Sequence, residues 1–399
     1  MRVLVADEFS KRHLDALKGL GLTVDFAPKL EADQLPEAAK DASILIVRST
    51  EVRRQVFENA KALSLVIRAG AGVNTIDVAA ASQGGVYVAN CPGQNAAAVA
   101  ELTMGLILAV DRRIPDEVAD LHRGKWNKKK YSQAKGLWGR TLSIIGMGSI
   151  GSAVGQRAKA FGMRVVGYSR SFDATRAQGV GFGRADSLIA AAREADVLSV
   201  HTPASQQTKG LISREVLAAL KTGALFVNTS RAEVVDQAAL FEEAKSGRLW
   251  VATDVFAKEP PAGEADFRSE LAQLPNVYGT HHIGASTEQA QSAIADEAVR
   301  IVASYLTQGV VPNCVNVAEK TPARFQLIVR HYDRVGVLAN VLAEVRNAGI
   351  NAQEVENTVF EGAAAACCKI QLDSRPSEEA LARIRGRTDE VIFAELIEL

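Results

Sequence analysis

Residues 141–151 read TLSIIGMGSIG, a short apolar run that leads directly into the spacing Gly-x-Gly-x-x-Gly. In such a unit Gly146 permits a tight turn, Gly148 lets a ligand approach the backbone, and Gly151 allows the following helix to pack closely on the strand. A helical pattern follows, and the next apolar run at 165–168 completes a strand–helix–strand unit. Because the helix N-terminus presents free N–H groups to an anion, this stretch predicts a dinucleotide-binding site.

Apolar runs of strand length recur on both sides of this unit and alternate with helical patterns. They precede it at 3–6, 23–27, 44–47, 66–69 and 86–89, and the second series comprises 142–146, 165–168, 197–201, 225–228, 251–254 and 277–279. This alternation is typical of parallel sheets covered by helices. We therefore expect an α/β fold with two doubly wound, Rossmann-like parallel-sheet domains.

Two helical stretches connect these domains. Residues 95–123 follow Cys91-Pro92-Gly93 and lead into the second domain, and residues 287–306 lead back to the first. After a polar link at 318–322, strand patterns at 325–329, 352–359, 364–372 and 392–397 enclose helical patterns at 337–347 and 378–385, a ferredoxin-like α+β order. We predict a substrate domain at 1–94 with 284–317, a nucleotide-binding domain at 95–283 and a third domain at 320–399.

Composition excludes several classes of protein. Lys plus Arg and Asp plus Glu number 46 each, so the chain lacks the basic excess expected of a nucleic-acid binder. The sequence shows neither a signal peptide nor a membrane span, and its four cysteines lack the spacing of a zinc site or a disulfide framework. We expect a cytoplasmic protein with no metal, no membrane association and no nucleic-acid partner.

Three segments of the second series carry residues suited to hydride chemistry at strand ends. They are 228–231 with Arg231, 254–260 with Glu259, and 280–286 with His282. Oxidising an alcohol requires a base, for which we propose His282, with Glu259 holding the imidazole and Arg231 binding a substrate carboxylate. His281 is a competing base, and an ordinary surface ion-pair cluster is the structural alternative.

The end of the strand at 165–168 bears on the choice of cofactor. A dinucleotide site for NAD usually carries an acidic residue here, but the chain reads Tyr168-Ser169-Arg170-Ser171. Ser169 and Arg170 could hold the 2′-phosphate of NADP, although Arg170 could also stack on adenine or remain in solvent. Thr202, after the strand at 197–201, is expected beside the cofactor. NAD is the predicted cofactor, with NADP as the alternative.

The chain resembles the D-2-hydroxyacid dehydrogenases, most closely the branch that acts on D-3-phosphoglycerate in serine biosynthesis. The resemblance covers nearly the whole chain and rests on 68–74, 139–151, 228–236, 254–260 and 282–286. It implies the catalytic set Arg231, Glu259 and His282, and a phosphate end of the substrate held by the first domain. Implied cofactor contacts are Ser149, Ile150, Thr229, Ser230, Asp254, Gly284 and Ala285, and implied substrate contacts are Arg48, Ser49, Arg68, Gly70 and Asn95.

The third domain resembles an ACT domain, a small module that binds amino acids at a dimer interface. His331, Asp333 and Asn351 match its ligand site. Serine-sensitive relatives often carry Asn and Pro where this chain has Asp333 and Val335. Feedback inhibition by L-serine and a purely structural role in dimerisation are both open at this point.

Two other functions remain as alternatives. One is an NADPH-dependent reductase of glyoxylate or hydroxypyruvate, suggested by Ser169 and Arg170. The other is a nucleotide-sensing regulator built on the same fold, which the complete Arg231, Glu259 and His282 set disfavours. We expect a homodimer or a homotetramer by analogy with the family.

His13 and His122 are predicted to be exposed helix residues.

Overall fold

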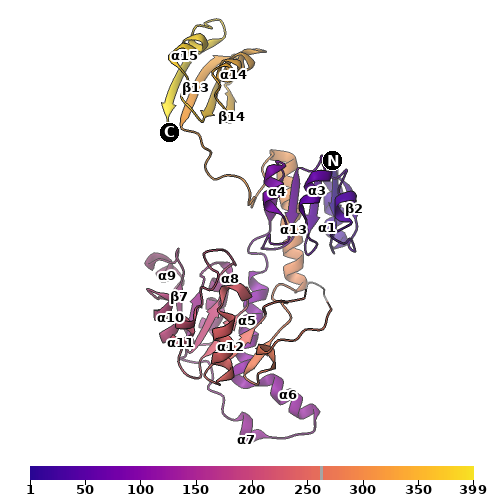
Figure 1. Ribbon diagram of the computed structural model, residues 1–399, viewed down its shortest axis with the longest axis vertical. Helices are drawn as coiled ribbons and strands as arrows, with labels where there is room; N and C mark the ends of the chain where they lie inside the picture. Colours follow the sequence, from indigo (N-terminus) through magenta and orange to yellow (C-terminus); the bar gives the residue numbers. More distant parts are fainter. Residues whose placement is uncertain (261–263) are drawn as a thin grey trace. The chain divides into compact units, whose positions relative to one another are not determined.

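The computed structural model describes residues 1–260 and 264–399 and divides them into two compact units, Met1–Asn316 and Val317–Leu399. The first unit contains two parallel sheets, and the second contains one antiparallel sheet (Figure 1). The α/β class with Rossmann-like sheets and a small C-terminal antiparallel sheet is thus confirmed. The domain limits predicted inside the first unit, at 94/95 and 283/284, remain predictions.

The first sheet has five parallel strands in the order β2-β1-β3-β4-β5. Apolar runs such as Ile44–Val47 are buried throughout because helices cover both faces of the sheet. The strands are β1 (Arg2–Val5), β2 (Thr23–Phe26), β3 (Ile44–Val47), β4 (Leu65–Arg68) and β5 (Tyr87–Asn90), and the helices are α1 (Lys11–Gly19), α2 (Leu35–Ala38), α3 (Arg54–Asn59), α4 (Val78–Gln83) and the returning α13 (Glu288–Gln308).

The second sheet has seven parallel strands in the order β12-β11-β10-β9-β6-β7-β8. The order reverses between β6 and β9, the switch point where open α/β sheets bind ligands. Its strands are β6 (Thr141–Ile145), β7 (Arg164–Tyr168), β8 (Gly183–Arg184), β9 (Val197–Val200), β10 (Leu225–Asn228), β11 (Trp250–Thr253) and β12 (Val277–Gly279). The two-residue β8 was not predicted, because it is too short to give a periodic signal.

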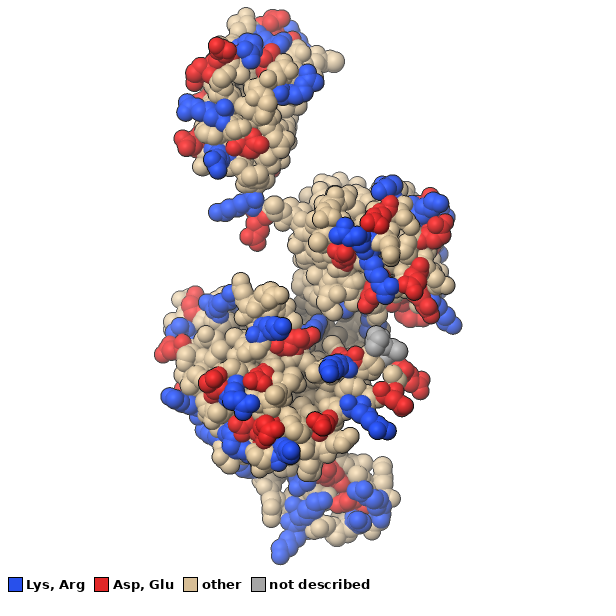
Figure 2. All heavy atoms as spheres, viewed as in Figure 1, with Lys and Arg blue, Asp and Glu red and all other residues tan. Residues whose placement is uncertain are grey.

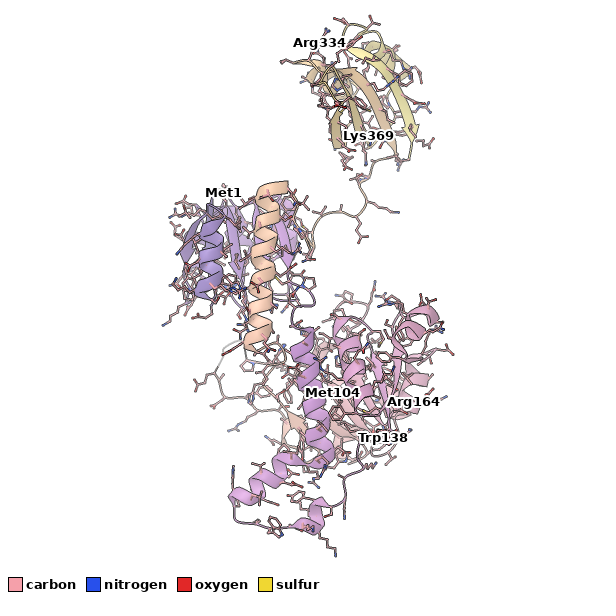
Figure 3. All side chains as sticks on the ribbon, turned by 180° about the vertical axis from the view of Figure 1, so that it is seen from behind. Met1, Met104, Trp138, Arg164, Arg334 and Lys369 are labelled. Carbon is pink, nitrogen blue, oxygen red and sulfur yellow. The ribbon has the colours of Figure 1, made fainter. Side chains whose placement is uncertain are left out.

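Two apolar cores flank the second sheet. The helix α5 (Ala96–Arg112) supplies one of them, and its Met104, labelled in Figure 3, packs in the same cluster as Leu142 and Val227. The other helices around this sheet are α8 (Ser149–Ala160), α9 (Ala174–Val180), α10 (Leu188–Glu194), α11 (Arg214–Ala219) and α12 (Gln237–Lys245), with short 3₁₀ turns at η1 (Ala232–Val234) and η2 (Leu271–Gln273).

The helical stretch expected at 95–123 is divided in two. Arg113 adopts a left-handed conformation, with φ 54°, between α5 and α6 (Ile114–His122). Pro115 follows in the first turn of α6, where a missing N–H is tolerated, whereas inside a continuous helix it would remove a hydrogen bond. A short helix α7 (Lys128–Tyr131) follows, and Asp120 of α6 accepts a 2.6 Å hydrogen bond from the hydroxyl of Tyr131.

The second unit has the predicted βαββαβ order: β13 (Phe325–Tyr332), α14 (Val337–Asn347), β14 (Ala352–Val359), β15 (Ala365–Leu372), α15 (Glu378–Arg385) and β16 (Val391–Glu398). Its antiparallel strands lie in the order β14-β15-β13-β16. Both helices pack on one face, and the buried core includes Leu327, Val341, Ile370 and Leu381. The unit therefore has a hydrophobic core of its own.

The surface carries both charges. On the face shown in Figure 2, basic and acidic side chains are interspersed over both units. None of the helices in the described ranges combines the length and the apolar character that crossing a membrane requires. Among the same residues, no group of three or more His, Cys, Asp and Glu side chains is arranged to hold a metal ion.

Candidate active site

The three glycines of the 146–151 segment occupy three different environments. Gly146 has φ +99°, and a Cβ atom there would lie 2.4 Å from the carbonyl oxygen of His201. At Gly151 a Cβ atom would lie 2.0 Å from the carbonyl oxygen of Gly146. A Cβ atom at Gly148 would meet nothing within 4 Å, so only this position opens onto free space. The structure therefore has a tight turn, an open approach and a close helix contact in the order expected for a dinucleotide.

The start of α8 is free to bind an anion. Gly148 is its N-cap and has no side chain to bond the first N–H groups. Gly146 N donates to the carbonyl of Tyr168 at 2.9 Å, which ties the turn to the end of β7. The hydroxyl oxygens of Ser169 and Thr202 are buried without a hydrogen-bond partner, although almost all buried polar atoms have one. The open backbone, the free helix end and these two hydroxyls fit a bound dinucleotide.

The other predicted cofactor residues form different contacts. Thr229 lies 2.9 Å, oxygen to oxygen, from the hydroxyl of Thr103 on α5, and Ser230 donates to Asn228 Oδ1 at 2.8 Å. Both hydroxyls are thus engaged within the protein at the end of β10. Ser149 is exposed and Ile150 half-buried at the start of α8. Arg170 is exposed, and its Nη1 donates to Gln207 Oε1 at 2.7 Å.

His282 and Glu259 form a direct hydrogen bond. Nδ1 of His282 lies 2.7 Å from Oε2 of Glu259, and the other oxygen, Oε1, accepts the backbone N–H of Phe256 at 2.7 Å. With a carboxylate on Nδ1, the neutral imidazole carries its proton there and exposes a lone pair on Nε2. His282, rather than its neighbour His281, has this partner.

Asp254 determines the path of the turn that carries His282. Its carboxylate is 1% exposed and accepts from Thr280 Oγ1 at 2.6 Å, Ile283 N at 2.9 Å and Gly284 N at 2.8 Å. The backbone N–H of His282 also donates to the Asp254 carbonyl at 2.8 Å. Asp254, predicted as a cofactor contact, thus holds the 280–284 turn in place, and Gly284 lies against its carboxylate.

Two residues of the loops that carry the acid–base pair have left-handed backbones. Lys258, which precedes Glu259, has φ 60°, and His282 itself has φ 53°. Such conformations cost about 1–3 kcal/mol each in residues other than glycine and persist where surrounding contacts enforce them. Here the bonds to Asp254 and Phe256 supply those contacts.

Three arginines meet near the predicted substrate position. Burial lowers the pKa of Arg68, and the positive charges of Arg231 and Arg48 lower it further. Nε of Arg68 is buried without a partner. A Cβ atom on Gly72 would lie 3.5 Å from Nη2 of Arg231, so this guanidinium reaches the loop that follows β4. The arrangement favours an anion, which would relieve the repulsion among the three charges.

The remaining substrate candidates lie on loops of the first sheet. Asp7 accepts the backbone N–H groups of Arg48, Ser49 and Thr50 at 2.6–3.1 Å and so fixes the loop after β3. Asn95 is the N-cap residue of α5, and its Oδ1 is buried without a partner. Gly70 is buried, and the side chain of Arg68 fills the space that a Cβ atom at this position would need.

Three other histidines, His13, His122 and His201, lie outside the acid–base pair. The prediction that His13 is exposed was wrong: it is 3% exposed, and its ring nitrogens lie 2.6 Å from Ser10 Oγ and 3.0 Å from Asp296 Oδ1. His122 is exposed, as predicted. Burial lowers the pKa of His201 to about 3, so this residue is neutral at physiological pH.

Comparison with known proteins gives the family. The sequence profile described as the NAD-binding domain of D-isomer specific 2-hydroxyacid dehydrogenases matches residues 104–284. A D-3-phosphoglycerate dehydrogenase of Methanocaldococcus jannaschii is 37% identical over 361 residues, which cover 89% of this chain and 67% of that protein. The chain belongs to the D-isomer specific 2-hydroxyacid dehydrogenase family.

Other proteins to which this chain is similar are named for different activities. A hydroxypyruvate reductase of Thermotoga maritima is 40% identical over 300 residues, covering 75% of this chain and 96% of the relative. Among solved structures, the NAD⁺-bound 3-phosphoglycerate dehydrogenase of Entamoeba histolytica superposes with a TM-score of 0.66 at 26% identity and covers 79% of this chain and 99% of its own. A D-lactate dehydrogenase of Aquifex aeolicus, complexed with NAD and lactic acid, gives 0.68 at 25% identity, covering 80% and 100%.

The family assignment confirms the predicted oxidoreductase class and NAD as cofactor. Sequence reasoning missed several residues that shape the site of this dehydrogenase. Thr280 and Asn228 orient the strand-end loops, and Arg176, in the first turn of α9, donates to the carbonyl of Ser171 in the loop after β7. A basic residue one turn into a helix gives no signal in a sequence, because its reach depends on the fold of the loop.

A matched pair of alanine variants tests the glycine turn. Gly151→Ala should lower the free energy of unfolding by about 1–3 kcal/mol, because its Cβ atom would overlap the Gly146 carbonyl. Gly148→Ala should leave stability unchanged but weaken nucleotide binding at least about tenfold, because its methyl group would occupy the open approach. Urea denaturation and calorimetric titration with NADH separate the two effects; equal stability of both variants would contradict the assignment of the turn.

Proposed function

We propose that this chain oxidises D-3-phosphoglycerate to 3-phosphohydroxypyruvate with NAD⁺, the step that supplies the carbon skeleton of serine. The observation that carries the proposal is the group of three arginines, in which burial and the neighbouring charges of Arg231 and Arg48 lower the pKa of Arg68. D-3-phosphoglycerate presents a carboxylate and a phosphate, so it offers two anionic groups to three guanidiniums. The 37% identity to a D-3-phosphoglycerate dehydrogenase supports the same substrate.

His282 acts as the base in this reaction. Its Nε2 lone pair takes the proton of the substrate hydroxyl, while the 2.7 Å bond from Nδ1 to Glu259 stabilises the imidazolium that forms. In the reverse direction the same nitrogen returns the proton. Glu259 is itself held by the N–H of Phe256, so the carboxylate stays oriented throughout.

Arg231 binds the carboxylate and polarises the C2 oxygen of the substrate. Its Nη1 donates to the carbonyl of Ser230 at 2.7 Å, and its Nη2 extends toward Gly72. One side of the guanidinium is thus anchored in the loop after β10 and the other is free for the substrate. Arg48 and Ser49, on the loop fixed by Asp7, bind the phosphate, with Arg68, Gly70 and Asn95 completing the site.

The turn from Gly146 to Gly151 and the ends of β7, β9 and β10 would hold the dinucleotide. When bound, the dinucleotide would supply the acceptor for the hydride that leaves C2 of the substrate. Gly148 and the free N–H groups of α8 receive the pyrophosphate. Ser169 and Thr202 offer their unpartnered hydroxyls, and Asp254 keeps His282 in position.

A general 2-oxo acid reductase is the second candidate. The 40% identity to a hydroxypyruvate reductase, of which this chain covers 96%, supports it. Hydroxypyruvate lacks the phosphate, so it would leave Arg48 without an anionic partner. The two candidate functions therefore predict different roles for Arg48: it binds the phosphate of the substrate in the first and has no anionic partner in the second.

We infer that the second unit is an ACT domain that binds an amino-acid effector such as L-serine. Its βαββαβ order and the loop before α14 support the inference. His331 is 1% exposed, with its ring nitrogens on the Tyr332 carbonyl and Asn357 Oδ1, so it shapes the loop from inside. Asp333 and Asn351 are exposed and are the residues proposed to contact the effector.

Assembly as a homodimer or homotetramer in the cytoplasm is also proposed. The helix α6 buries none of its residues and exposes Ile114, Val118 and Leu121. The thiols of Cys91, Cys314, Cys367 and Cys368 are free, as in a reducing compartment. Light scattering after size exclusion and cell fractionation test the two statements; a monomer at micromolar concentration, or a secreted protein, would contradict them.

The substrate assignment is tested by initial rates of NADH oxidation with 3-phosphohydroxypyruvate, hydroxypyruvate and glyoxylate. We expect the phosphorylated acid to give the highest kcat/KM. Arg48→Ala should lower kcat/KM for it by about 10- to 100-fold, the loss of one charge-assisted contact, and change the value for hydroxypyruvate much less. Arg54→Ala, which removes an exposed arginine from α3, is the matched control. Equal loss for both acids would support the general reductase.

The effector proposal is tested by titrating the full chain with L-serine and with D-serine as control. We expect L-serine alone to release heat and to inhibit turnover at millimolar concentration, with both effects reduced in Asp333→Ala. If L-serine neither binds nor inhibits at that concentration, the second unit serves assembly only.

A further inference from the structure

The loop after β7 faces the glycine turn, carries the cationic side chain of Arg170 and is contacted by a second one from α9. β7 ends at Tyr168, whose carbonyl accepts the N–H of Gly146 at 2.9 Å, so residues 169–172 begin beside the turn. In dinucleotide folds this strand end meets the ribose of the adenosine, and a carboxylate there binds the 2′-hydroxyl. In this chain the strand is followed by Ser169-Arg170-Ser171 instead.

The guanidinium of Arg176 reaches from α9 into this loop. Its Nη1 donates to the carbonyl of Ser171 at 2.8 Å and lies 3.3 Å from Ser171 Oγ. Its Nη2 lies 3.4 Å from the carbonyl oxygen of Met147, inside the glycine turn. Arg176 therefore connects the strand-end loop to the segment that receives the pyrophosphate.

Arg170 projects from the same loop toward the segment that follows β9. Its Nη1 donates to Oε1 of Gln207, which lies in the segment after β9. The partners of Arg170 and Arg176 are an amide, a hydroxyl and backbone carbonyls, all of them neutral. These partners hold the two guanidiniums in place without neutralising their charge. The next carboxylate along the chain, Asp173, accepts the N–H of Arg176 and caps α9.

A hydroxyl completes the cluster. Ser169 Oγ is buried and has no hydrogen-bond partner, which leaves one donor and its lone pairs unused. A buried polar atom of this kind requires a partner that the protein itself does not supply. A phosphate oxygen would accept the hydroxyl hydrogen and would pair with both guanidiniums.

We propose that Ser169, Arg170 and Arg176 form a subsite for the 2′-phosphate of adenosine, so that this dehydrogenase uses NADP(H) as well as NAD(H). The inference rests on the dinucleotide site and does not depend on which hydroxy acid is the substrate. In this proposal Arg176 helps to select NADP(H) over NAD(H), although it lies on α9 and not at the end of β7.

Calorimetric titration of the full chain with adenosine 2′,5′-diphosphate and with 5′-AMP tests the proposal, because these two ligands differ only in the 2′-phosphate. We expect the diphosphate to bind at least about tenfold more tightly, since charge-assisted bonds to two guanidiniums are added. The experiment contains no hydroxy acid, so its outcome is independent of the proposed substrate.

Variants locate the effect. Arg170→Ala and Arg176→Ala should each reduce the ratio of the two affinities by about tenfold, and Ser169→Asp should bring it to one or below, because a carboxylate repels the phosphate. Arg164→Ala is the control, because Arg164, labelled in Figure 3, carries the same charge at the opposite end of β7. There it pairs with Glu194. Its ratio should stay within about twofold of the original.

Thermal unfolding of each variant establishes that it is folded before its affinities are compared. Three results would overturn the proposal. The first is a diphosphate that binds no more tightly than 5′-AMP. The second is a ratio of affinities that survives all three replacements, at Ser169, Arg170 and Arg176, and the third is the absence of binding by either nucleotide.

Discussion

The 2.7 Å hydrogen bond between His282 Nδ1 and Glu259 Oε2 determines how the rest of the site must be built. It requires two loops from different strands to bring their side chains together, and each loop does so with a left-handed residue, Lys258 or His282. The contacts that hold these conformations come from buried groups at the end of β11. Chief among them is the Asp254 carboxylate, which takes up three donors of the turn. The acid–base pair thus depends on an interior carboxylate that need not touch the substrate.

Parallel strands explain why these groups converge. β10, β11 and β12 pair in register, so the loops that follow them lie side by side at one edge of the sheet. The glycine turn lies at the same edge, where the strand order reverses between β6 and β9. Arg231, Glu259 and His282 therefore occupy successive strand ends beside a dinucleotide site, which is the arrangement that hydride transfer with a proton acceptor requires.

Much of this could be read from the sequence, because apolar runs and the glycine spacing are local signals. The strand ends could be placed for the same reason, and with them the three catalytic candidates. Features that depend on tertiary contacts could not be predicted. His13 is buried because α13, distant in sequence, packs on α1 and supplies its partner Asp296. The contact of Arg176 with Met147 likewise depends on how a short loop folds. The break of the 95–123 helix at Arg113 has instead a local signal, Pro115, which the prediction of one continuous helix did not take into account.

The most direct test of the account is the turnover number of His282→Ala, measured with NADH and 3-phosphohydroxypyruvate beside the matched variant His281→Ala. We expect the first replacement to lower kcat by about 10²- to 10⁴-fold, the usual contribution of a general acid or base, and the second to change kcat by less than about twofold. If His282→Ala retained its turnover, His282 would not be the acid–base residue. If the unaltered chain showed no turnover while its cellular function persisted, the chain would be a nucleotide-sensing regulator rather than an enzyme.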